Sequence, residues 1–505
     1  MTPAAPRPAL RGLTLGLSLP EILKAGLILA AFTLATRAWI FGNPLLNNDE
    51  QFYLVVGDRL LQGDLMYVDI WDRKPIGLFL IYAFVCWAFT DPLIGYHLFA
   101  AAWVALTSAI LFVIARRLVS FAAALGSAAA YPAWLLVFGG LGGQSPVFYN
   151  LPMVAAAALT FSVVAQADDR RLSLQGCAIM LLTGIAMQIK YTALFEGVFF
   201  GLSLLWVGWS RGRPLPRLAA DAATWIICAL SPTLATYGAY VAAGHGAEFI
   251  QTNFVSIFQD KDEFLPALGR LTGLSIGLTP FAVCARIAFR RWRLDRAIGG
   301  REARWIFAWA GAACAAFLVY GVWLDFYVLP MLPPLCLVAA LAFDSVAKIR
   351  PAIAIIIGLG LAGGFGRAVA DTPDRGSAQQ VYRLAEKVRP HLGSGCLYVN
   401  ERVPILYLLT HSCLPTRYIF PDHLTWDRYE DSLGVGQAEE MNNLLSRKPS
   451  VIVINLIPDD FSNPANMRRL LASGLQRDYR LVDTARVGSG NFAVYALTKR
   501  RPPNP

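Results

Sequence analysis

The sequence predicts a polytopic α-helical membrane protein that ends in an α/β domain outside the membrane. Of its 505 residues, 56% are hydrophobic and only 15% are charged, whereas a soluble chain carries about 25% charge. Long apolar runs recur between Glu21 and Ala370, and several reach the roughly 20 residues that cross a bilayer. From Asp371 onward polar residues return and no run is that long. We therefore expect a membrane domain over residues 1–370 and a second domain over residues 371–505.

The basic residues indicate how the chain is oriented. The net charge of +10 would suit nucleic acid, but the Arg and Lys residues form short clusters between apolar runs instead of one basic face. Clusters of this kind are typical of cytoplasmic loops. They lie at residues 116–117, 170–171, 211–217, 290–304 and 348–350. We therefore expect these loops inside the cell and no nucleic-acid partner.

The spans follow in order from this charge pattern. Residues 22–41 are expected to be a retained anchor with a cytoplasmic N-terminus. Residues 76–89 are short for a span and are expected at the outer interface, inside a first outer loop of about residues 42–95. With a span over residues 96–114, the alternation predicts about eleven spans and a tail outside, in the periplasm of a Gram-negative cell. The other nine centre near Ala129, Ala157, Leu181, Gly201, Ala229, Ile276, Ala313, Leu337 and Ile356.

The tail is expected to mix helices and strands. Residues 396–400 and 450–455 are typical of short buried strands, and residues 404–409 and 437–445 of helices. Alternation on either side of Gly488 predicts a hairpin of residues 479–484 with 491–498. Of the eight cysteines, Cys396 and Cys413 lie in this tail, where an oxidising compartment would allow them to pair.

Two adjacent carboxylates, Asp49 and Glu50, follow the first span directly. Partial burial raises the pKa of a carboxyl group toward working pH, so either residue could act as a general base. The alternative is structural. Asn48 or Asp49 could cap a helix over residues 50–62, and acidic residues in its first turn would favour the helix dipole.

Cations lie at the same predicted membrane face. Arg73 and Lys74 open the interfacial run, and Lys190 lies near the outer end of a span. They could hold the phosphate of a lipid, or extend to headgroups as anchors, and Lys190 could instead pair with a carboxylate. Asp325 and Tyr327 begin a late span from the outside. Tyr327 suits an interfacial aromatic residue, whereas an acid at the depth of Asp325 usually has a partner.

The outer loop over residues 244–270 could bind a divalent cation, although such acidic runs are more often simply solvated. Its candidate ligands are His245, Glu248, Asp260, Asp262 and Glu263, beside Lys261. The sequence has no P-loop, no GxGxxG motif after a strand and no HExxH, and GxSxG occurs only within or at the end of apolar runs, at residues 208–212 and 273–277. Nucleotide hydrolysis, zinc proteolysis and serine hydrolysis are therefore not expected.

Three groups of short motifs resemble bacterial integral-membrane glycosyltransferases of the GT-C fold, in particular the aminoarabinose transferase-like and protein O-mannosyltransferase-like enzymes. The first outer loop carries Asp49-Glu50-x-x-Tyr53, then Leu60-Leu61-x-Gly63, Tyr67 and Lys74-Pro75. The late span begins Phe326-Tyr327-Val328-Leu329-Pro330. The tail carries related segments at residues 407–410, 415–418 and 447–449. The likeness extends along nearly the whole chain.

The resemblance implies a sugar donor on a polyprenyl phosphate, an acceptor that enters from the outer face, and one inverting displacement. Asp49 and Glu50 would be catalytic, with Asp49 as base or as organiser of a divalent cation. Arg73, Lys74, Lys190 and Tyr327 would bind the donor phosphate. Tyr53, Tyr67, Asn150 and Asp325 would contact substrate. Related enzymes often have a second acid where this chain has Asn150. Because Asn cannot act as a base, the acid–base role would fall on Asp49 and Glu50.

The expected function is therefore transfer of a sugar to a lipid, glycan or protein of the cell envelope, at the outer face of the inner membrane. The alternatives are a transporter or flippase of envelope lipids and a non-catalytic scaffold. A transporter would favour an inverted repeat with broken spans in matching halves, and no such pairing is evident in the sequence, although Pro132, Pro232 and Pro280 interrupt apolar runs.

Overall fold

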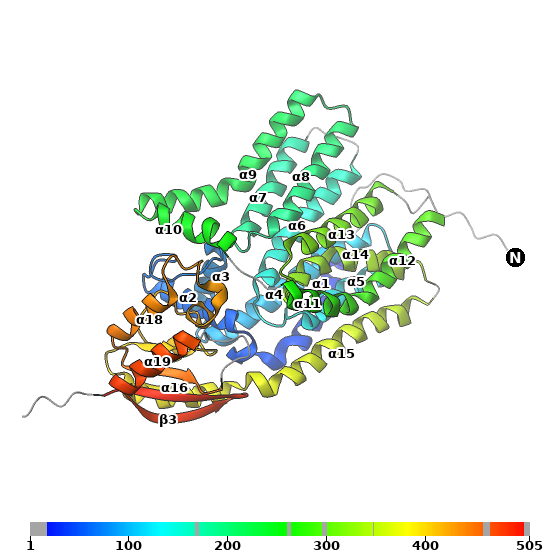
Figure 1. Cartoon of the computed structure of the whole chain (residues 1–505). Coiled ribbons are helices and arrows are strands. Elements are labelled where there is room, and N and C mark those ends of the chain that lie inside the picture. The colour runs from blue at the N-terminus through cyan, green and yellow to red at the C-terminus, as the bar shows by residue number, and fades with distance from the viewer. Residues whose placement is uncertain are drawn as a thin grey trace, which may run out of the picture.

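The chain folds into a large helical part and a smaller part that contains a sheet (Figure 1). The computed structural model describes residues 18–166, 171–259, 264–294, 300–346, 348–457 and 465–498. The helices of the first part are α1 (Leu19–Arg37), α2 (Asn48–Leu61), α3 (Ile76–Ala88), α4 (Pro92–Arg116), α5 (Phe121–Val137), α6 (Ser145–Ala165), α7 (Leu172–Met187), α8 (Ala193–Ser210), α9 (Leu215–Ala242), α10 (Gly246–Ile250), α11 (Phe264–Gly277), α12 (Thr279–Leu294), α13 (Arg301–Tyr320), α14 (Leu332–Phe343) and α15 (Ile349–Arg375), with the 3₁₀-helix η6 (Asp325–Met331) before α14.

The prediction of a polytopic membrane protein is confirmed. Among the described residues, eight helices are long and apolar enough to cross a membrane, and the bent pair α11–α12 makes a ninth. Helices α5 and α7 are apolar but shorter, with 17 and 16 residues. Each of the eleven predicted spans falls on one of these helices. Helix α3, with 13 residues, extends only about 20 Å at 1.5 Å per residue, too short to cross.

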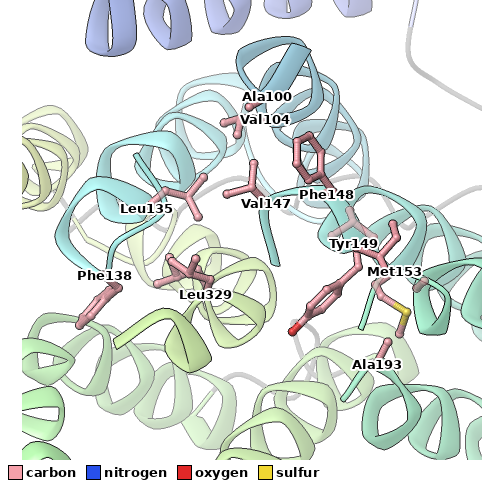
Figure 2. Close-up of a cluster of buried hydrophobic side chains, with 14 of the residues drawn as sticks. Ala100, Val104, Leu135, Phe138, Val147, Phe148, Tyr149, Met153, Ala193 and Leu329 are labelled. Atoms are coloured by element: carbon pink, nitrogen blue, oxygen red, sulfur yellow. The ribbon is translucent and has the colours of Figure 1, made fainter. Parts of the chain in front are cut away.

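Packing inside the helical part depends on close fit. In Figure 2, Val104 of α4, Leu135 of α5, Phe148 of α6 and Leu329 of η6 meet in one buried cluster. Helix α15 packs directly on α5. At Gly364 the two helices lie so close that a Cβ added to this glycine would clash with Leu136. Small residues at such contacts are how membrane helices pack. The contact fixes the last turns of α15 beside the loop that follows α5.

The tail forms a four-stranded sheet with strand order β1-β2-β4-β3. The strands are β1 (Leu397–Val399), β2 (Val451–Asn455), β3 (Tyr479–Val487) and β4 (Gly490–Leu497), and the helices are α16 (Ala378–Leu392), α17 (Leu406–Thr410), α18 (Gln437–Ser446) and α19 (Ala465–Asp478). Strands β1 and β2 are parallel, with α17 and α18 in the crossover, and β4 pairs antiparallel with both β2 and β3. The predicted strands, two helices and hairpin are confirmed.

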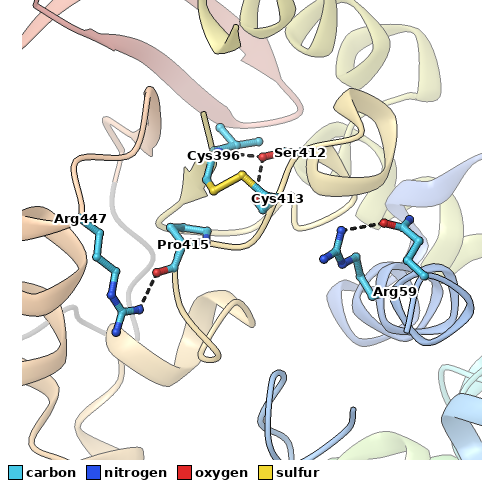
Figure 3. The surroundings of a disulfide bond; sticks show 8 residues. Arg59, Cys396, Ser412, Cys413, Pro415 and Arg447 are labelled. Atoms are coloured by element: carbon cyan, nitrogen blue, oxygen red, sulfur yellow. Dashed lines mark hydrogen bonds between the residues drawn. A yellow bond between two sulfur atoms is a disulfide. The ribbon is translucent and has the colours of Figure 1, made fainter. Parts of the chain in front are cut away.

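One disulfide joins the start of β1 to the chain after α17 (Figure 3). Cys396 and Cys413 are bonded. Next to them, the hydroxyl of Ser412 accepts a hydrogen bond from the amide of Leu397 at 2.7 Å and donates one to the carbonyl of Cys413 at 2.8 Å. The bond therefore fixes the origin of residues 413–429, which we call the capping segment because it covers the first outer loop.

The capping segment and the first outer loop pack together through rings and backbone. The amide of Trp71 donates to the carbonyl of Arg417 at 2.9 Å. The ring of His423 lies 4.6 Å from that of Trp71, and the ring of Phe420 lies 5.2 Å from that of Phe52. Helix α15 continues past residue 371 and ends at Arg375. The division of the chain at residue 371 remains a prediction.

Candidate active site

The centre of the candidate site is a lysine between two carboxylates. Lys74 Nζ lies 3.5 Å from Asp49 Oδ1 and 3.2 Å from Asp72 Oδ2. Burial opposes the charge on Lys74, but the two carboxylates outweigh that effect and raise the pKa of Lys74 above its ordinary value. The predicted proximity of Asp49 to Lys74 is therefore present in the structure, and Lys74 remains a cation across the physiological range.

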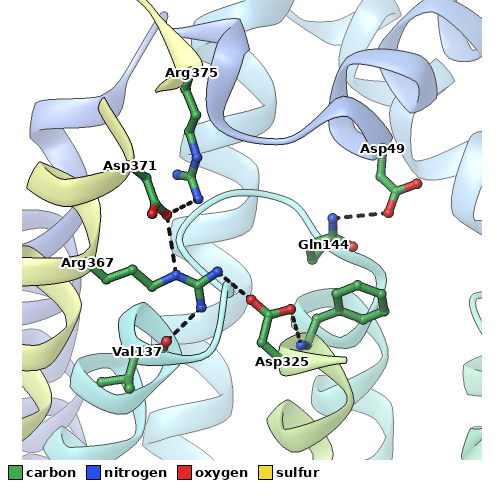
Figure 4. Close-up of polar contacts among 8 residues, drawn as sticks. Asp49, Val137, Gln144, Asp325, Arg367, Asp371 and Arg375 are labelled. Atoms are coloured by element: carbon green, nitrogen blue, oxygen red, sulfur yellow. Dashed lines mark hydrogen bonds and ion pairs between the residues drawn. The ribbon is translucent and has the colours of Figure 1, made fainter. Parts of the chain in front are cut away.

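The first turn of α2 presents Asp49 to this cluster. Asn47 caps the helix by accepting from the Asp49 amide at 2.8 Å, so the expected cap at Asn48 or Asp49 is wrong by one or two residues. This leaves the Asp49 side chain free to contact other groups. Gln144, at the start of α6, donates to Asp49 Oδ2 at 3.4 Å (Figure 4). Asp49 is thus held between Lys74 on one side and Gln144 on the other.

Two predicted substrate residues instead contact Lys74. The Tyr67 hydroxyl donates to the Lys74 carbonyl at 3.0 Å, from a backbone with φ of 72°. The centre of the Tyr53 ring lies 5.2 Å from the Lys74 ammonium, a cation–π distance. Burial raises the pKa of Tyr53 well above its ordinary value, so its hydroxyl stays protonated. Both tyrosines position Lys74, and contact with substrate remains a prediction for each.

Lys190 approaches the same cluster from the loop between α7 and α8. Its ammonium lies 4.2 Å from the centre of the Tyr327 ring and 4.8 Å from that of Phe326. Burial, together with the positive charge of Lys74, lowers the pKa of Lys190 to about 8, against an opposing effect of Asp49. No hydrogen bond or ion pair to a carboxylate is found for Lys190 within the described part of the chain. The site therefore holds a cation that carboxylates do not neutralise.

Arg73 and Tyr327 complete the predicted phosphate-binding group. The Arg73 guanidinium lies 4.9 Å from the centre of the Tyr429 ring, at the end of the capping segment. The Tyr327 hydroxyl bonds to that of Tyr320 at 3.0 Å. Next to them, a pocket runs between α8, α13 and η6, lined by Tyr149, Thr192, Phe195, Glu196, Ala313, Ala316, Phe317, Tyr320, Tyr327, Pro330 and Met331. Aromatic and apolar side chains thus continue from the cations toward the interior of the helical part.

Glu50 contacts a different set of groups from Lys74. It is 1% exposed, and its pKa is raised to about 7 by burial, although the Gly143 amide favours the charged form. Around it, Asp325 pairs with Arg367 of α15, as expected for an acid at that depth, and Arg367 and Arg375 both pair with Asp371 (Figure 4). The two predicted catalytic acids therefore belong to different polar groups.

Asn150 is placed behind the site. It is 1% exposed and its amide donates to the Tyr131 hydroxyl and the Leu329 carbonyl, each at 3.1 Å. These bonds connect α6 to α5 and to η6, the segment that carries Asp325 and Tyr327. Asn150 therefore fixes the position of η6, and its contact with a sugar stays a prediction.

Several residues of the site were not among those predicted. Asp72 and Gln144 flank Lys74 and Asp49, and Phe420 and His423 of the capping segment cover them. Burial, and then the charges of Lys74 and Arg73, lower the pKa of His423 well below its ordinary value, so the ring is neutral. The glycine-rich run Gly139-Gly140-Leu141-Gly142-Gly143 before Gln144 was the available sequence signal, because such a run marks close backbone approach.

The predicted cation site is only partly within the described structure. His245 Nδ1 lies 3.5 Å from Glu248 Oε1 in that loop. Asp260, Lys261, Asp262 and Glu263 lie outside the described residues. In the part that the structure describes, no group of three or more His, Cys, Asp or Glu side chains is arranged to hold a metal ion. A divalent cation remains a prediction without a located site.

The fold can be compared with known structures. The sequence matches no protein-family model, and no curated protein is similar to it at a significant level. Among solved structures, the crystal structure of ArnT from Cupriavidus metallidurans bound to undecaprenyl phosphate superposes with a TM-score of 0.59 and 14% sequence identity, over 94% of this chain and 97% of that one. The chain therefore has the fold of ArnT, the GT-C fold that the motifs of its first outer loop, late span and tail predict.

Proposed function

We propose that this protein is a membrane glycosyltransferase that moves a sugar from a polyprenyl-phosphate donor to a lipid, glycan or protein of the cell envelope. The observation that carries the proposal is the group of Asp49, Lys74 and Lys190, in which an acid faces two cations beside an aromatic pocket between membrane helices. The fold supports it, because the structure of ArnT with that fold holds undecaprenyl phosphate.

The cations would bind the donor phosphate. Lys190 has no neutralising carboxylate in contact among the described residues, and Lys74 is held charged by Asp49 and Asp72, so the two can stabilise the negative charge that grows on a departing phosphate. Arg73 would add a third cation and Tyr327 a hydroxyl at the pocket entrance. The pocket between α8, α13 and η6 would take the first part of the prenyl chain.

Asp49 would act as the general base. The oxygen of an acceptor hydroxyl attacks the anomeric carbon of the sugar, and Asp49 accepts the hydroxyl proton. The bond from that carbon to the phosphate oxygen breaks, and the polyprenyl phosphate leaves with the bonding electrons. One displacement of this kind inverts the anomeric centre. Gln144, which donates to Asp49, would hold the carboxylate in place.

The reaction would take place at the outer face of the inner membrane, with the C-terminal domain in the periplasm. Positive clusters in alternate loops support this orientation. The disulfide between Cys396 and Cys413 supports it as well, because such bonds persist in oxidising compartments and are rare in the cytosol.

The test compares wild type with Asp49→Asn in membranes supplied with a radiolabelled polyprenyl-phosphate sugar. We expect the variant to lose at least a hundredfold in transfer, since general-base catalysis contributes about 10²–10⁴, and to bind undecaprenyl phosphate with little change. Gln62→Ala, an exposed change at the far end of α2, is the control. Full transfer by Asp49→Asn would remove the catalytic assignment, and lipid movement without any glycosyl product would favour the transporter.

A further inference from the structure

The segment that follows α9 packs on the first outer loop. Helix α10 leads directly into η3 (Gln251–Val255), a short π-helix. The ring of Phe249, in α10, lies 5.7 Å from that of Tyr67. The hydroxyl of Tyr240, near the end of α9, donates to the Met66 carbonyl at 3.0 Å. Residues 240–255 therefore reach the part of the loop that precedes the candidate site.

Asn253 is a fully buried polar residue of η3. It is 0% exposed, its amide oxygen accepts from the Tyr191 hydroxyl at 3.0 Å, and its amide nitrogen donates to the Phe249 carbonyl at 3.0 Å. A further hydrogen bond joins its side chain to that of Tyr67. Because this bond favours the charged form of the tyrosine, the amide nitrogen is the donor. Asn253 thus uses its oxygen and both of its N–H groups.

The hydrogen bonds of Asn253 lead to both lysines of the site. Tyr191 directly follows Lys190 in the sequence. At the other end, the Tyr67 hydroxyl donates to the Lys74 carbonyl at 3.0 Å. Burial raises the pKa of Tyr67 well above its ordinary value, so the hydroxyl keeps the proton that this bond needs. Tyr191, Asn253 and Tyr67 therefore form one directed chain of hydrogen bonds between the segment of Lys190 and the backbone of Lys74.

The two lysines are otherwise held by different neighbours. Lys190 lies against aromatic rings of η6, whereas Lys74 lies between the carboxylates of Asp49 and Asp72. Burial, and then the charge of Lys74, lower the pKa of Lys190, so the two ammonium groups repel each other. A fixed spacing between them has to be imposed by other groups, and the chain through Asn253 is made of uncharged groups that can impose it.

We propose that Asn253 is a positioning residue that sets the spacing of Lys74 and Lys190, so that both ammonium groups contact one donor phosphate. The proposal rests on the proposed function and adds a residue that acts only through its neighbours. Hydrogen bonds in a buried chain strengthen one another, and a shift of about 1 Å far from the chemistry can cost about a hundredfold in rate. Loss of Asn253 would let the two cations move apart.

The test measures equilibrium binding of undecaprenyl phosphate to the full-length protein in nanodiscs, together with thermal unfolding. Asn253→Leu removes every side-chain hydrogen bond of this residue. Tyr191→Phe removes only the hydroxyl at one end of the chain and keeps the ring, which lies 5.5 Å from that of Phe254. We expect each variant to bind about three- to tenfold more weakly at pH 7. The double variant should bind no more weakly than Asn253→Leu, because both changes break the same chain.

The matched control is Thr252→Val. Thr252 is 1% exposed in the same π-helix, and its hydroxyl has no hydrogen-bond partner among the residues that the structure describes, so this variant should bind like wild type. The pH profile separates positioning from general destabilisation. A loss of affinity between pH 7 and pH 9 that depends on the charge of Lys190 should shrink in Asn253→Leu, whereas destabilisation alone would leave its size unchanged.

The proposal is overturned if Tyr191→Phe and Asn253→Leu bind like wild type, if their losses multiply in the double variant, or if Thr252→Val weakens binding as much as they do. Should Asn253→Leu unfold, Tyr191→Phe decides the question alone. If Lys74→Gln and Lys190→Gln both bind undecaprenyl phosphate like wild type, the phosphate site of the proposed function fails, and this role of Asn253 fails with it.

Discussion

Lys190 gives the site a dependence on pH that a single substitution can isolate. Burial lowers the pKa of Lys190 to about 8, whereas the carboxylates hold the pKa of Lys74 above its ordinary value. Above pH 8 Lys190 therefore loses its charge while Lys74 keeps it. The second ionisation of a phosphate monoester, with a pKa of about 6, is complete by then. We expect the affinity for undecaprenyl phosphate to fall about tenfold between pH 7 and pH 9, measured by equilibrium binding.

Lys190→Arg is the matched variant for this measurement. A guanidinium stays charged throughout that range, so the variant should bind with nearly the same affinity at both pH values. Lys190→Gln should bind weakly at pH 7 and show no further loss at pH 9. An unchanged affinity of wild type from pH 7 to pH 9 would show that Lys190 does not meet the phosphate as a cation.

The residues of the site that could be predicted were those whose position in the sequence is unusual. Charge directly after the first apolar span made Asp49 a candidate, charge at the start of the interfacial run made Lys74 a candidate, and depth in the membrane indicated that Asp325 needs a partner. The partner itself, Arg367, lies 42 residues further along and on another helix, so no local pattern connects the two. Asp72 was not predicted for another reason. An acid two residues from Lys74 is equally typical of a solvated surface loop, so its position in the sequence did not indicate a site.

The disulfide links the stability of one segment to the site. Cys396 and Cys413 close a loop with a separation of 17 residues, for which chain entropy predicts about 3 kcal/mol of stabilisation. The capping segment begins at this bond and brings Phe420 to 5.8 Å from Lys74 Nζ. We expect the double variant Cys396→Ser/Cys413→Ser to unfold at a lower temperature and to transfer sugar more slowly, with little change in undecaprenyl phosphate affinity.

Reductant provides the comparison. Wild type with reductant should unfold like the double variant, and the double variant should not respond to reductant. Cys314→Ala, which alters a free cysteine of α13, should behave like wild type. If thiol titration showed the bond reduced while the unfolding temperature stayed the same, the bond would have no part in holding the capping segment.

Elements were predictable where one physical requirement dominates. A bilayer demands long apolar helices, so hydropathy placed each of the eleven predicted spans on an apolar helix, and alternation of apolar residues revealed β3 and β4. Helix α16 was missed, although Ser377 and Gln380 form a capping box at its start. Its apolar face packs against the sheet and α17. Only two residues separate it from α15, so in the sequence it could not be distinguished from the end of the last predicted span.

At the scale of the whole molecule, the polar groups near α2 form two sets. Lys74 and Lys190 lie near an aromatic pocket between membrane helices, whereas Glu50 lies with Asp325 and the arginine residues near the end of α15. Hydropathy cannot predict such a division, because it arises from loops of the helical part and the end of α15 that meet only in the folded chain. Of the two sets, the one around Lys74 includes Asp49, the base of the proposed reaction.

This arrangement requires that the first outer loop and the C-terminal domain lie on one side of the membrane, away from the basic loops. We expect alkaline phosphatase, which is active only in an oxidising compartment, to be active when fused after Gly244 or after Thr498 and inactive after Gly212, with a fluorescent-protein fusion showing the reverse. Gly212 lies among the Arg residues between α8 and α9, and Gly244 follows the opposite end of α9. The contact of Trp71 with Arg417 ties the tail to the loop of Asp49. Activity at Gly212 together with inactivity at Thr498 would therefore put Asp49 in the cytoplasm and contradict the proposed reaction at the outer face.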